Sequence, residues 1–269
     1  AGCEDVGSPV FAKFNATNNA GTANSTSTTF TITKDKVLFE EIIGNSTETR
    51  RGKVPTLLAI KVRDFNSSLI PNLPLIFYVT LDGSVYDSGS TISTNDSSYA
   101  NYNFLAGCSP KYQAGYQKWK VVLTNNECYA DNSTESYYNL SVLVTGDIIL
   151  SFQKPDGLTN YTQEQKVPFL GATTDDCGDP LTTTVRFFAN KSSTSFECSP
   201  VSRVGANAYT CDWQTDIATP MGWYNVTMIA NRSYHYANAT ANLGIPGLFY
   251  LFPVKKLENP SAFPTQEGW

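Results

Sequence analysis

The stretch GYQKWKVVL runs from Gly115 to Leu123, and a second stretch, GWYNVTMIA, runs from Gly222 to Ala230. Each is followed at the same distance by a tyrosine motif, YADNST from Tyr129 and YANAT from Tyr236. The two glycines, like the two tyrosines, are 107 residues apart. A unit of that length can bury its own core, unlike the repeats of about 20 to 50 residues found in solenoids. The sequence therefore predicts a tandem repeat of whole domains.

A weaker copy of the same pattern lies near the N-terminus. The motif ANST begins at Ala23, after the alternating run from Phe11 to Thr17, and lies 107 residues before Ala130 of the next copy. At this period the 269 residues hold two whole units and pieces of others. We expect residues 1–39 to form terminal strands of an incomplete unit or a donor segment. The whole domains are then 40–146 and 147–245, and 246–269 is an extended segment that in one interpretation begins a further unit.

Strand patterns dominate the chain, and no window shows a convincing helical period. In GYQKWKVVL, Trp119 alternates with Lys118 and Lys120, which predicts the tryptophan in the core and the lysines in water. The second domain contains short candidate strands from Ile148–Phe152 to Ala237–Leu243, with turns between them. This predicts an all-β protein of tandem immunoglobulin-like β-sandwich domains, with a small barrel as the alternative. No linker separates the domains, so we expect a stiff joint.

Aromatic residues concentrate at YTCDW (209–213) and at GWY (222–224). We expect them to fill the space between two sheets, and the alternative is an exposed aromatic patch for binding.

Composition excludes some functions. Charged residues make up 16%, the net charge is −5 and the pI is near 4.9, which disfavours a nucleic-acid partner. The only basic cluster, RRGK (50–53), is interpreted as a solvated loop.

The longest apolar run, GLFYLFPV (247–254), is shorter than the ~18 residues of a membrane span. No signal peptide is visible, so Ala1 is interpreted as a mature or cut terminus.

Many asparagines carry the N-glycosylation acceptor pattern Asn-X-Ser/Thr. The position of some acceptors within the strand alternation supports glycosylation. Asn225 and Thr227 share one strand face, which is expected to point outward, while Tyr224 and Val226 share the other. We therefore expect N-linked glycans on most of the acceptor sites: Asn15, Asn24, Asn45, Asn66, Asn95, Asn132, Asn139, Asn160, Asn190, Asn225, Asn231 and Asn238.

The cysteines number six, with no C-x-x-C spacing, which favours disulfides in an oxidising compartment over zinc. Spacing suggests the pairs Cys198–Cys211 and Cys108–Cys128. Cys3 and Cys177 remain, and either they pair with each other or Cys3 bridges to a neighbouring molecule.

Catalytic patterns are missing. The sole histidine, His235, lies between acceptor sites, so no triad can be proposed. The cluster Asp175, Asp176 and Asp179 is expected to cap backbone amides on a turn, with calcium binding as the alternative. Adjacent Glu40 and Glu41 should point to opposite faces of a strand. No glycine-rich phosphate loop is present. The sequence predicts no catalytic, cofactor-binding or metal-binding residue, no cofactor and no enzymatic activity.

Several motifs at these spacings, TTDDCGDP (173–180), AYTCDW (208–213), GWYNVT (222–227) and SYHYANAT (233–240), resemble the Ig-like repeats of secreted archaeal surface proteins. The stretch from AGYQKWKV to YADNSTESYYNL in the first domain is similar, but it lacks the DDCG turn and the CDW triplet. The resemblance implies an extracellular or cell-surface protein of a surface layer, adhesin, stalk or filament.

The ends of the chain carry apolar alternation, at Val10, Ala12, Phe14, Phe30 and Ile32, without a complete domain to bury it. Either the chain is a segment of a longer row of domains, or its ends complete a sheet in the next copy. The expected function is a structural subunit of a self-assembling filament or surface layer, a head-to-tail homopolymer of the chain with itself. The alternative is an adhesin or receptor ectodomain that binds a glycan or protein through end loops.

Overall fold

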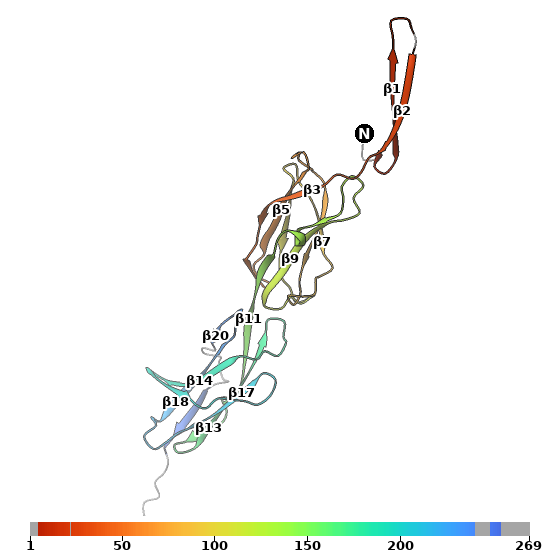
Figure 1. Ribbon diagram of the computed structural model, residues 1–269. Coiled ribbons are helices and arrows are strands. Elements are labelled where there is room, and N and C mark those ends of the chain that lie inside the picture. The colour runs from red at the N-terminus through yellow and green to blue at the C-terminus, as the bar shows by residue number, and fades with distance from the viewer. Residues whose placement is uncertain (1–4, 22, 240–247, 254–269) are drawn as a thin grey trace, which may run out of the picture. The chain divides into compact units, whose positions relative to one another are not determined.

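The computed structural model describes residues 5–21, 23–239 and 248–253 (Figure 1). More than half of these residues are in strands, and helix among them is limited to short 3₁₀ turns such as η2 (Thr134–Ser136). The fold is all-β, as the alternation predicts. The chain divides into two compact units that meet between Thr145 and Gly146. Within the described ranges, no helix has the length and apolar character needed to cross a membrane.

The sandwich of the first unit contains two sheets. One has the order β3-β5-β8, with strands Val37–Ile43, Thr56–Asp64 and Tyr99–Phe104. The other has the order β4-β11-β9-β6-β7, with strands Thr47–Arg50, Leu140–Lys154, Gly115–Leu123, Pro74–Val79 and Ser90–Ser93. Strand β4 runs parallel to β11, and the other neighbours are antiparallel. A short strand, β10 (Asn132–Ser133), adds to β9.

The second unit repeats this plan, and β11 continues into it without a break. Its first sheet has the order β16-β17-β13-β11, with new strands Ser202–Arg203, Ala208–Gln214 and Lys166–Asp175. Its second sheet has the order β12-β21-β18-β14-β15, with strands Tyr161–Thr162, Leu248–Phe252, Gly222–Asn231, Thr184–Lys191 and Thr194–Cys198. Strand β12 is parallel to β21, as β4 is to β11.

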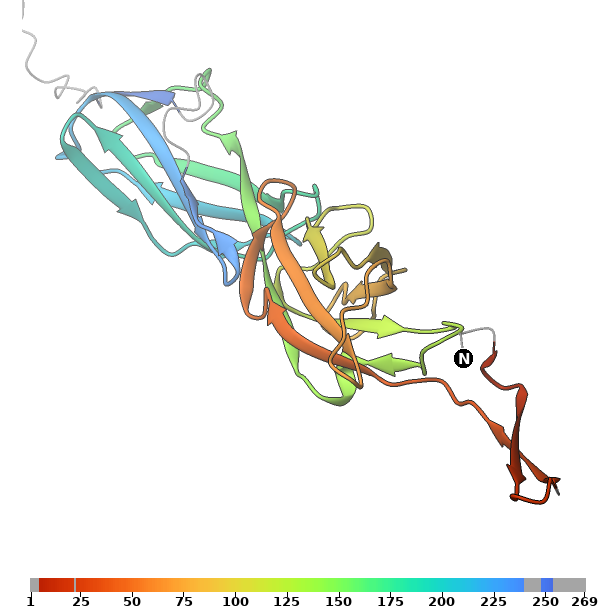
Figure 2. The same cartoon turned by 90° about the horizontal axis from the view of Figure 1, so that it is seen from above.

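The strands of each unit therefore lie in two layers with one shared topology (Figure 2). The 107-residue repeat marks equivalent strands, because Gly115 begins β9 and Gly222 begins β18. Both glycines have positive φ, 134° and 125°, a backbone conformation that disfavours other residues. The topology is that of an immunoglobulin-like sandwich.

Alternation along the repeated strands places the aromatics in the cores. Trp119 is 2% exposed and stacks on Phe77, with ring centroids 6.2 Å apart. In the second unit Tyr224 is fully buried and Trp213 is 8% exposed. Burying a large apolar side chain contributes about 1.5–3 kcal/mol, so such residues dominate the stability of each core. Trp223 is an exception to the expectation for GWY, since alternation leaves it 59% exposed.

A disulfide joins the two sheets of the second unit. Cys198 ends β15 and Cys211 lies on β17, with their Cα atoms 6.1 Å apart. This is the pairing that their spacing suggested, although it links facing sheets and not neighbouring strands. Cys108, Cys128 and Cys177 are also disulfide-bonded. The pairing of Cys108 with Cys128 stays a prediction, and so do both alternatives for Cys3, which lies outside the described residues: a bond to Cys177 or a bridge to a neighbouring molecule.

In both units the segment after the repeated strand returns to the first strand of the sandwich. In the first unit, Tyr129 forms a parallel bridge with Asp35, just before β3. In the second, β19 (His235–Tyr236) pairs in parallel with β11 and places Tyr236 beside Asp147. The repeated tyrosine motif thus encodes a backbone contact with the start of each sandwich.

An asparagine side chain completes this contact in each unit. The Nδ2 of Asn132 donates a hydrogen bond to the carbonyl of Val37 at 2.8 Å, and the Nδ2 of Asn238, on β20 (Asn238–Ala239), donates one to the carbonyl of Ile148 at 2.8 Å. Val37 and Ile148 are the first core residues of their sandwiches, exposed by 2% and 1%. We call these two bonds the loop clamps.

Two expected boundaries need correction. The first sandwich begins at Val37 and not at residue 40, because Val37 and Phe39 are core residues. The second ends with β21 (Leu248–Phe252) and not at residue 245, since Phe249 and Leu251 are fully buried and β21 pairs with β18. Residues 246–269 therefore contain the closing strand of the second unit. Of the expected strand 237–243, the structure describes only 237–239.

Removing a loop clamp should destabilise its own unit. We expect Asn132→Ala and Asn238→Ala each to lower the free energy of unfolding by about 1 kcal/mol, because a carbonyl loses its hydrogen bond. The measurement is urea unfolding of unglycosylated protein. Asn139→Ala, which changes an exposed asparagine in the same loop as Asn132, is the control and should have little effect. Equal stability of all three variants would contradict the clamp.

Candidate functional site

A β-hairpin precedes the first sandwich. Strands β1 (Pro9–Thr17) and β2 (Ala23–Thr31) are antiparallel and pair along their whole lengths, from Pro9 opposite Thr31 to Thr17 opposite Ala23. In the described part of the chain they form a sheet of two strands with no third partner. An isolated hairpin is marginally stable in water, so these strands need a further surface to pack against.

The pairing register separates an apolar face from a polar one. Residues directly opposite share a face, so Val10 lies beside Phe30, and Ala12 and Phe14 follow on the same side. Phe14 is 65% exposed and Phe30 is 50% exposed. These four residues are called the hairpin apolar face below. The sequence predicts that this face is buried, and within the described residues it is open.

The other face of the hairpin is polar apart from Phe11. It carries Lys13 and the acceptor Asn15, opposite Ser27 and Ser25. A glycan on Asn15 would therefore extend from the face opposite to Phe14.

The hairpin has the features of the last two strands of a unit. Gly7 precedes β1 with a positive φ of 79°, as Gly115 and Gly222 open β9 and β18. Strand β2 is followed within a few residues by β3, the first strand of the next sandwich. In the same way, the part of β11 that closes the first sandwich continues directly into the part that opens the second. The interpretation of residues 1–39 as part of an incomplete unit or a donor segment stays a prediction, and its upper bound moves to residue 36 because Val37 is a core residue of the first sandwich.

The acceptor asparagines differ in exposure. Asn132, Asn190 and Asn225 are half-buried. The side chain of Asn24 is not described. The remaining acceptors have exposed side chains: Asn15, Asn45, Asn66, Asn95, Asn139, Asn160, Asn231 and Asn238.

Some acceptor amides already have a structural role. A glycan attaches to Nδ2, and this atom donates to main-chain carbonyls in Asn132, Asn238 and Asn190. In Asn190 it also donates to the hydroxyl of Thr227 at 2.8 Å. The sequence pattern cannot separate these asparagines from acceptors with an unengaged amide, because the partners lie 35 or more residues away.

A tyrosine-rich hollow of about 400 Å³ lies beside β9 and η2 in the first unit. At its wall, Lys120 forms an ion pair with Glu135 at 2.6 Å, and the hydroxyl of Tyr86 donates to the same carboxylate at 3.2 Å. The Lys120 ammonium also lies 4.1 Å from the centroid of the Tyr86 ring. Sequence reasoning missed this site, although two consecutive tyrosines, Tyr137 and Tyr138, were visible directly before Asn139.

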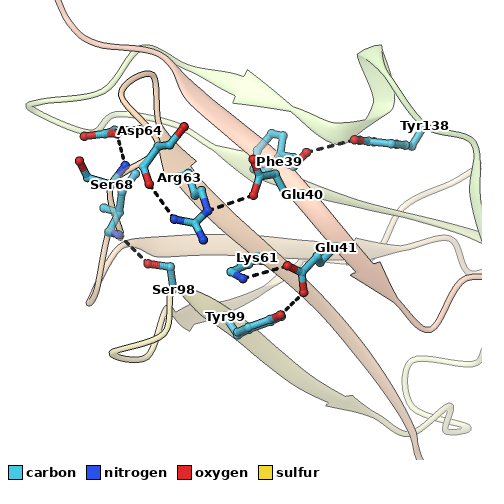
Figure 3. A network of polar contacts seen from close by, with 12 residues as sticks. Phe39, Glu40, Glu41, Lys61, Arg63, Asp64, Ser68, Ser98, Tyr99 and Tyr138 are labelled. Carbon is cyan, nitrogen blue, oxygen red and sulfur yellow. Dashed lines mark hydrogen bonds and ion pairs between the residues drawn. The ribbon is translucent and has the colours of Figure 1, made fainter.

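A polar network covers the outer face of β3 and β5 (Figure 3). Lys61 pairs with Glu41 at 2.8 Å, and Arg63 pairs with Glu40 at 3.1 Å. Both cations lie on one face of β5, so the prediction that the two glutamates point to opposite faces is wrong. The cause is a β-bulge, because the register shifts after Glu40 and Glu41 has a φ of 40°. Each carboxylate has its own cation, an arrangement that stabilises the pairing of the strands.

The acidic turn of the second unit is used for backbone capping. Asp175 is 4% exposed, and its Oδ1 accepts hydrogen bonds from the amides of Cys177 and Asp179 at 3.0 and 2.9 Å. The carboxylate oxygens of Asp175 and Asp176 and the Sγ of Cys177 lie within 4.8 Å of one another. Because Cys177 is in a disulfide, its sulfur is not a thiolate ligand.

The basic cluster RRGK is not a solvated loop throughout, as the sequence suggested. Arg51 is 2% exposed, and its guanidinium donates to the carbonyl of Tyr112 at 3.1 Å. Its backbone amide donates to the carbonyl of Thr145. Only Gly52 and Lys53 are exposed, and Arg50 is half-buried.

Comparison with known proteins gives structural matches only. No protein-family model and no curated protein sequence matches this chain. Three Ig domains of titin, in a variant with glutamate changed to alanine, match with a TM-score of 0.51 and 12% identity over 92% of this chain and 75% of that chain. An I-band fragment of titin gives a TM-score of 0.50 at the same identity and coverage. The fold is that of immunoglobulin domains. At this identity the likeness concerns the fold of the immunoglobulin-like units alone.

The tyrosine-rich hollow predicts a loss of stability at alkaline pH. Burial, together with the Glu135 carboxylate, raises the pKa of Tyr86 to about 12. An unfolded tyrosine titrates near pH 10, at about its reference value, so above that pH the unfolded chain releases the proton first. The stabilising contribution is complete below about pH 10 and is lost between about pH 10 and 12. We expect wild type to be more stable than Tyr86→Phe at pH 8 and the difference to shrink by about pH 11.5.

Urea unfolding at both pH values measures this difference. The control is Tyr116→Phe, which removes the hydroxyl of an exposed tyrosine on β9 (57% exposed) and leaves Tyr86 and Glu135 in place. If the difference in the free energy of unfolding between wild type and Tyr86→Phe did not change with pH, the raised pKa of Tyr86 in the folded protein would be contradicted.

Proposed function

We propose that this chain is a non-enzymatic, extracellular structural glycoprotein that assembles with copies of itself. Its terminal strands complete a sheet of the next copy, head to tail, in a filament or surface layer of the kind that archaeal surface proteins form. A head-to-tail contact of this type does not close on itself and therefore grows a fibre.

The observation that carries the proposal is the hairpin apolar face. Phe14 and Phe30 are exposed on a two-stranded sheet that has open edges on both sides. When a second copy supplies strands, the apolar face is buried and the backbone groups at the sheet edges form hydrogen bonds. This mode of binding is known as β-augmentation. The acceptor Asn15 is on the opposite face, so a glycan there leaves this contact accessible.

Two features support an extracellular location. The described cysteines are all in disulfides, which persist in oxidising compartments. Exposed acceptor asparagines with unengaged amides, such as Asn66 and Asn139, are available for N-linked glycans. The exterior of the two sandwiches is then a sugar-coated polar surface.

The test is self-association of the full chain, with matched variants on the two faces of the hairpin. Phe14→Asp with Phe30→Asp places two charges on the apolar face. Ser27→Asp with Thr29→Asp places two charges on the polar face of the same hairpin. Both pairs change the net charge of the hairpin by the same amount.

We expect wild type and the polar-face variant to form filaments or sheets by negative-stain microscopy and to sediment as polymers. The apolar-face variant should weaken association by at least about 100-fold, because each buried phenylalanine contributes about 1.5–3 kcal/mol. The unfolding of both sandwiches should be unchanged in all three proteins. A wild type that stays monomeric at high concentration would contradict assembly and favour an adhesin that binds through its end loops. Equal assembly of both variants would contradict the hairpin as the contact.

A further inference from the structure

The tyrosine-rich hollow of the first unit has the chemistry of a carbohydrate site. Its volume of about 400 Å³ is within the range of about 300–1,000 Å³ that small-ligand pockets have. Tyr86, Tyr137 and Tyr138 line it together with the charged Lys118 and Glu135. A sugar ring has apolar C–H faces, which pack on aromatic rings, and hydroxyl groups, which bind charged side chains. The hollow offers both kinds of partner.

The aromatic rings are exposed at fixed positions. Tyr137 is 67% exposed and Tyr138 is 41% exposed. The hydroxyl of Tyr138 donates to the carbonyl of Phe39 at 3.0 Å, which anchors this ring (Figure 3). The backbone amides of both tyrosines donate to the carbonyl of Thr134, which holds the turn that carries them. A ligand would meet a preformed surface and would not have to order the loop.

The acceptor Asn139 identifies the occupant. Asn139 also lines the hollow, and its exposed side-chain amide has no hydrogen-bond partner within the part of the chain that the structure describes. It is followed by Leu140 and Ser141, which complete the acceptor pattern. The other acceptor of this loop, Asn132, has its Nδ2 in the loop clamp. A glycan on Asn139 therefore begins at the wall of the hollow, and the tether gives it a high effective concentration there.

We propose that the first sugars of an N-linked glycan on Asn139 lie in this hollow, against Tyr137 and Tyr86, and form part of the folded first unit. The proposal rests on the glycoprotein part of the proposed function and is independent of assembly.

The test is a double-mutant cycle on glycosylated full-length protein. Ser141→Ala removes the acceptor pattern and keeps Asn139, and Tyr137→Ala removes the ring. Glycopeptide mass spectrometry first establishes the occupancy of Asn139. We expect each single variant to lower the unfolding temperature of the first unit by about 4 °C, and the double variant to lower it no further, because both changes remove one contact. Tyr137→Phe should retain wild-type behaviour.

The matched control is Ser97→Ala, which removes the acceptor pattern of Asn95. Asn95 is exposed on a turn, where its Oδ1 caps the amides of Ser97 and Tyr99, bonds that the alanine variant keeps. This variant should not change the unfolding temperature. Combined with Tyr137→Ala, it should give the same unfolding temperature as Tyr137→Ala alone.

Two results would contradict the proposal, and they differ in their consequences for the glycoprotein and assembly proposals. An unmodified Asn139 in the native protein removes the occupant, and if the other acceptors are also unmodified the glycoprotein proposal fails with it. A modified Asn139 with additive effects of Ser141→Ala and Tyr137→Ala shows that the glycan does not pack on the ring, while the glycoprotein and assembly proposals are untouched.

Discussion

The core strands of the two sandwiches and strand β1 of the hairpin each have an apolar face, and such a face must be covered. Alternation along a strand fixes which side is apolar, and burial of that side supplies most of the stability of the fold. In the two sandwiches the requirement is met internally, with residues such as Trp119 and Tyr224 between the sheets. In the hairpin β1–β2 the same pattern finds no cover among the described residues. The pattern that builds the sandwiches is therefore also present in the hairpin, where among the described residues its apolar side chains stay exposed.

Alternation and the repeat allowed the fold class to be predicted from sequence, because both are local or periodic properties. The all-β class and the core positions of the repeated strands followed from them. Details that depend on distant contacts did not. The buried position of Arg51 depends on the carbonyl of Tyr112, 61 residues further along the chain. The bulge at Glu41 also broke the alternation rule without any glycine or proline to signal it.

The closing strand of the second unit was misplaced for a similar reason. The sequence predicts that the run GLFYLFPV lies beyond the second domain, because the candidate strand Ala237–Leu243 is the last one expected in that unit. In each unit, however, that motif belongs to a return segment that contacts the first strand, and the closing strand follows it. In the first unit β10 and η2 occupy this segment before β11 begins, and the equivalent order holds for β19, β20 and β21. The repeat period was correct, but the assignment of strands within the period was not.

The return segment places acceptor asparagines in two different surroundings. Its tyrosine and asparagine bind the first strand of the sandwich, so the acceptor pattern at Asn132 and Asn238 contains a structural amide. In the first unit the segment then continues through Tyr137 and Tyr138 to Asn139, whose amide is unengaged. Two acceptors seven residues apart thus have opposite surroundings, one closed by the fold and one open beside an aromatic hollow. Because sequence records only the pattern, the distinction between a structural asparagine and a modification site depends on the folded chain.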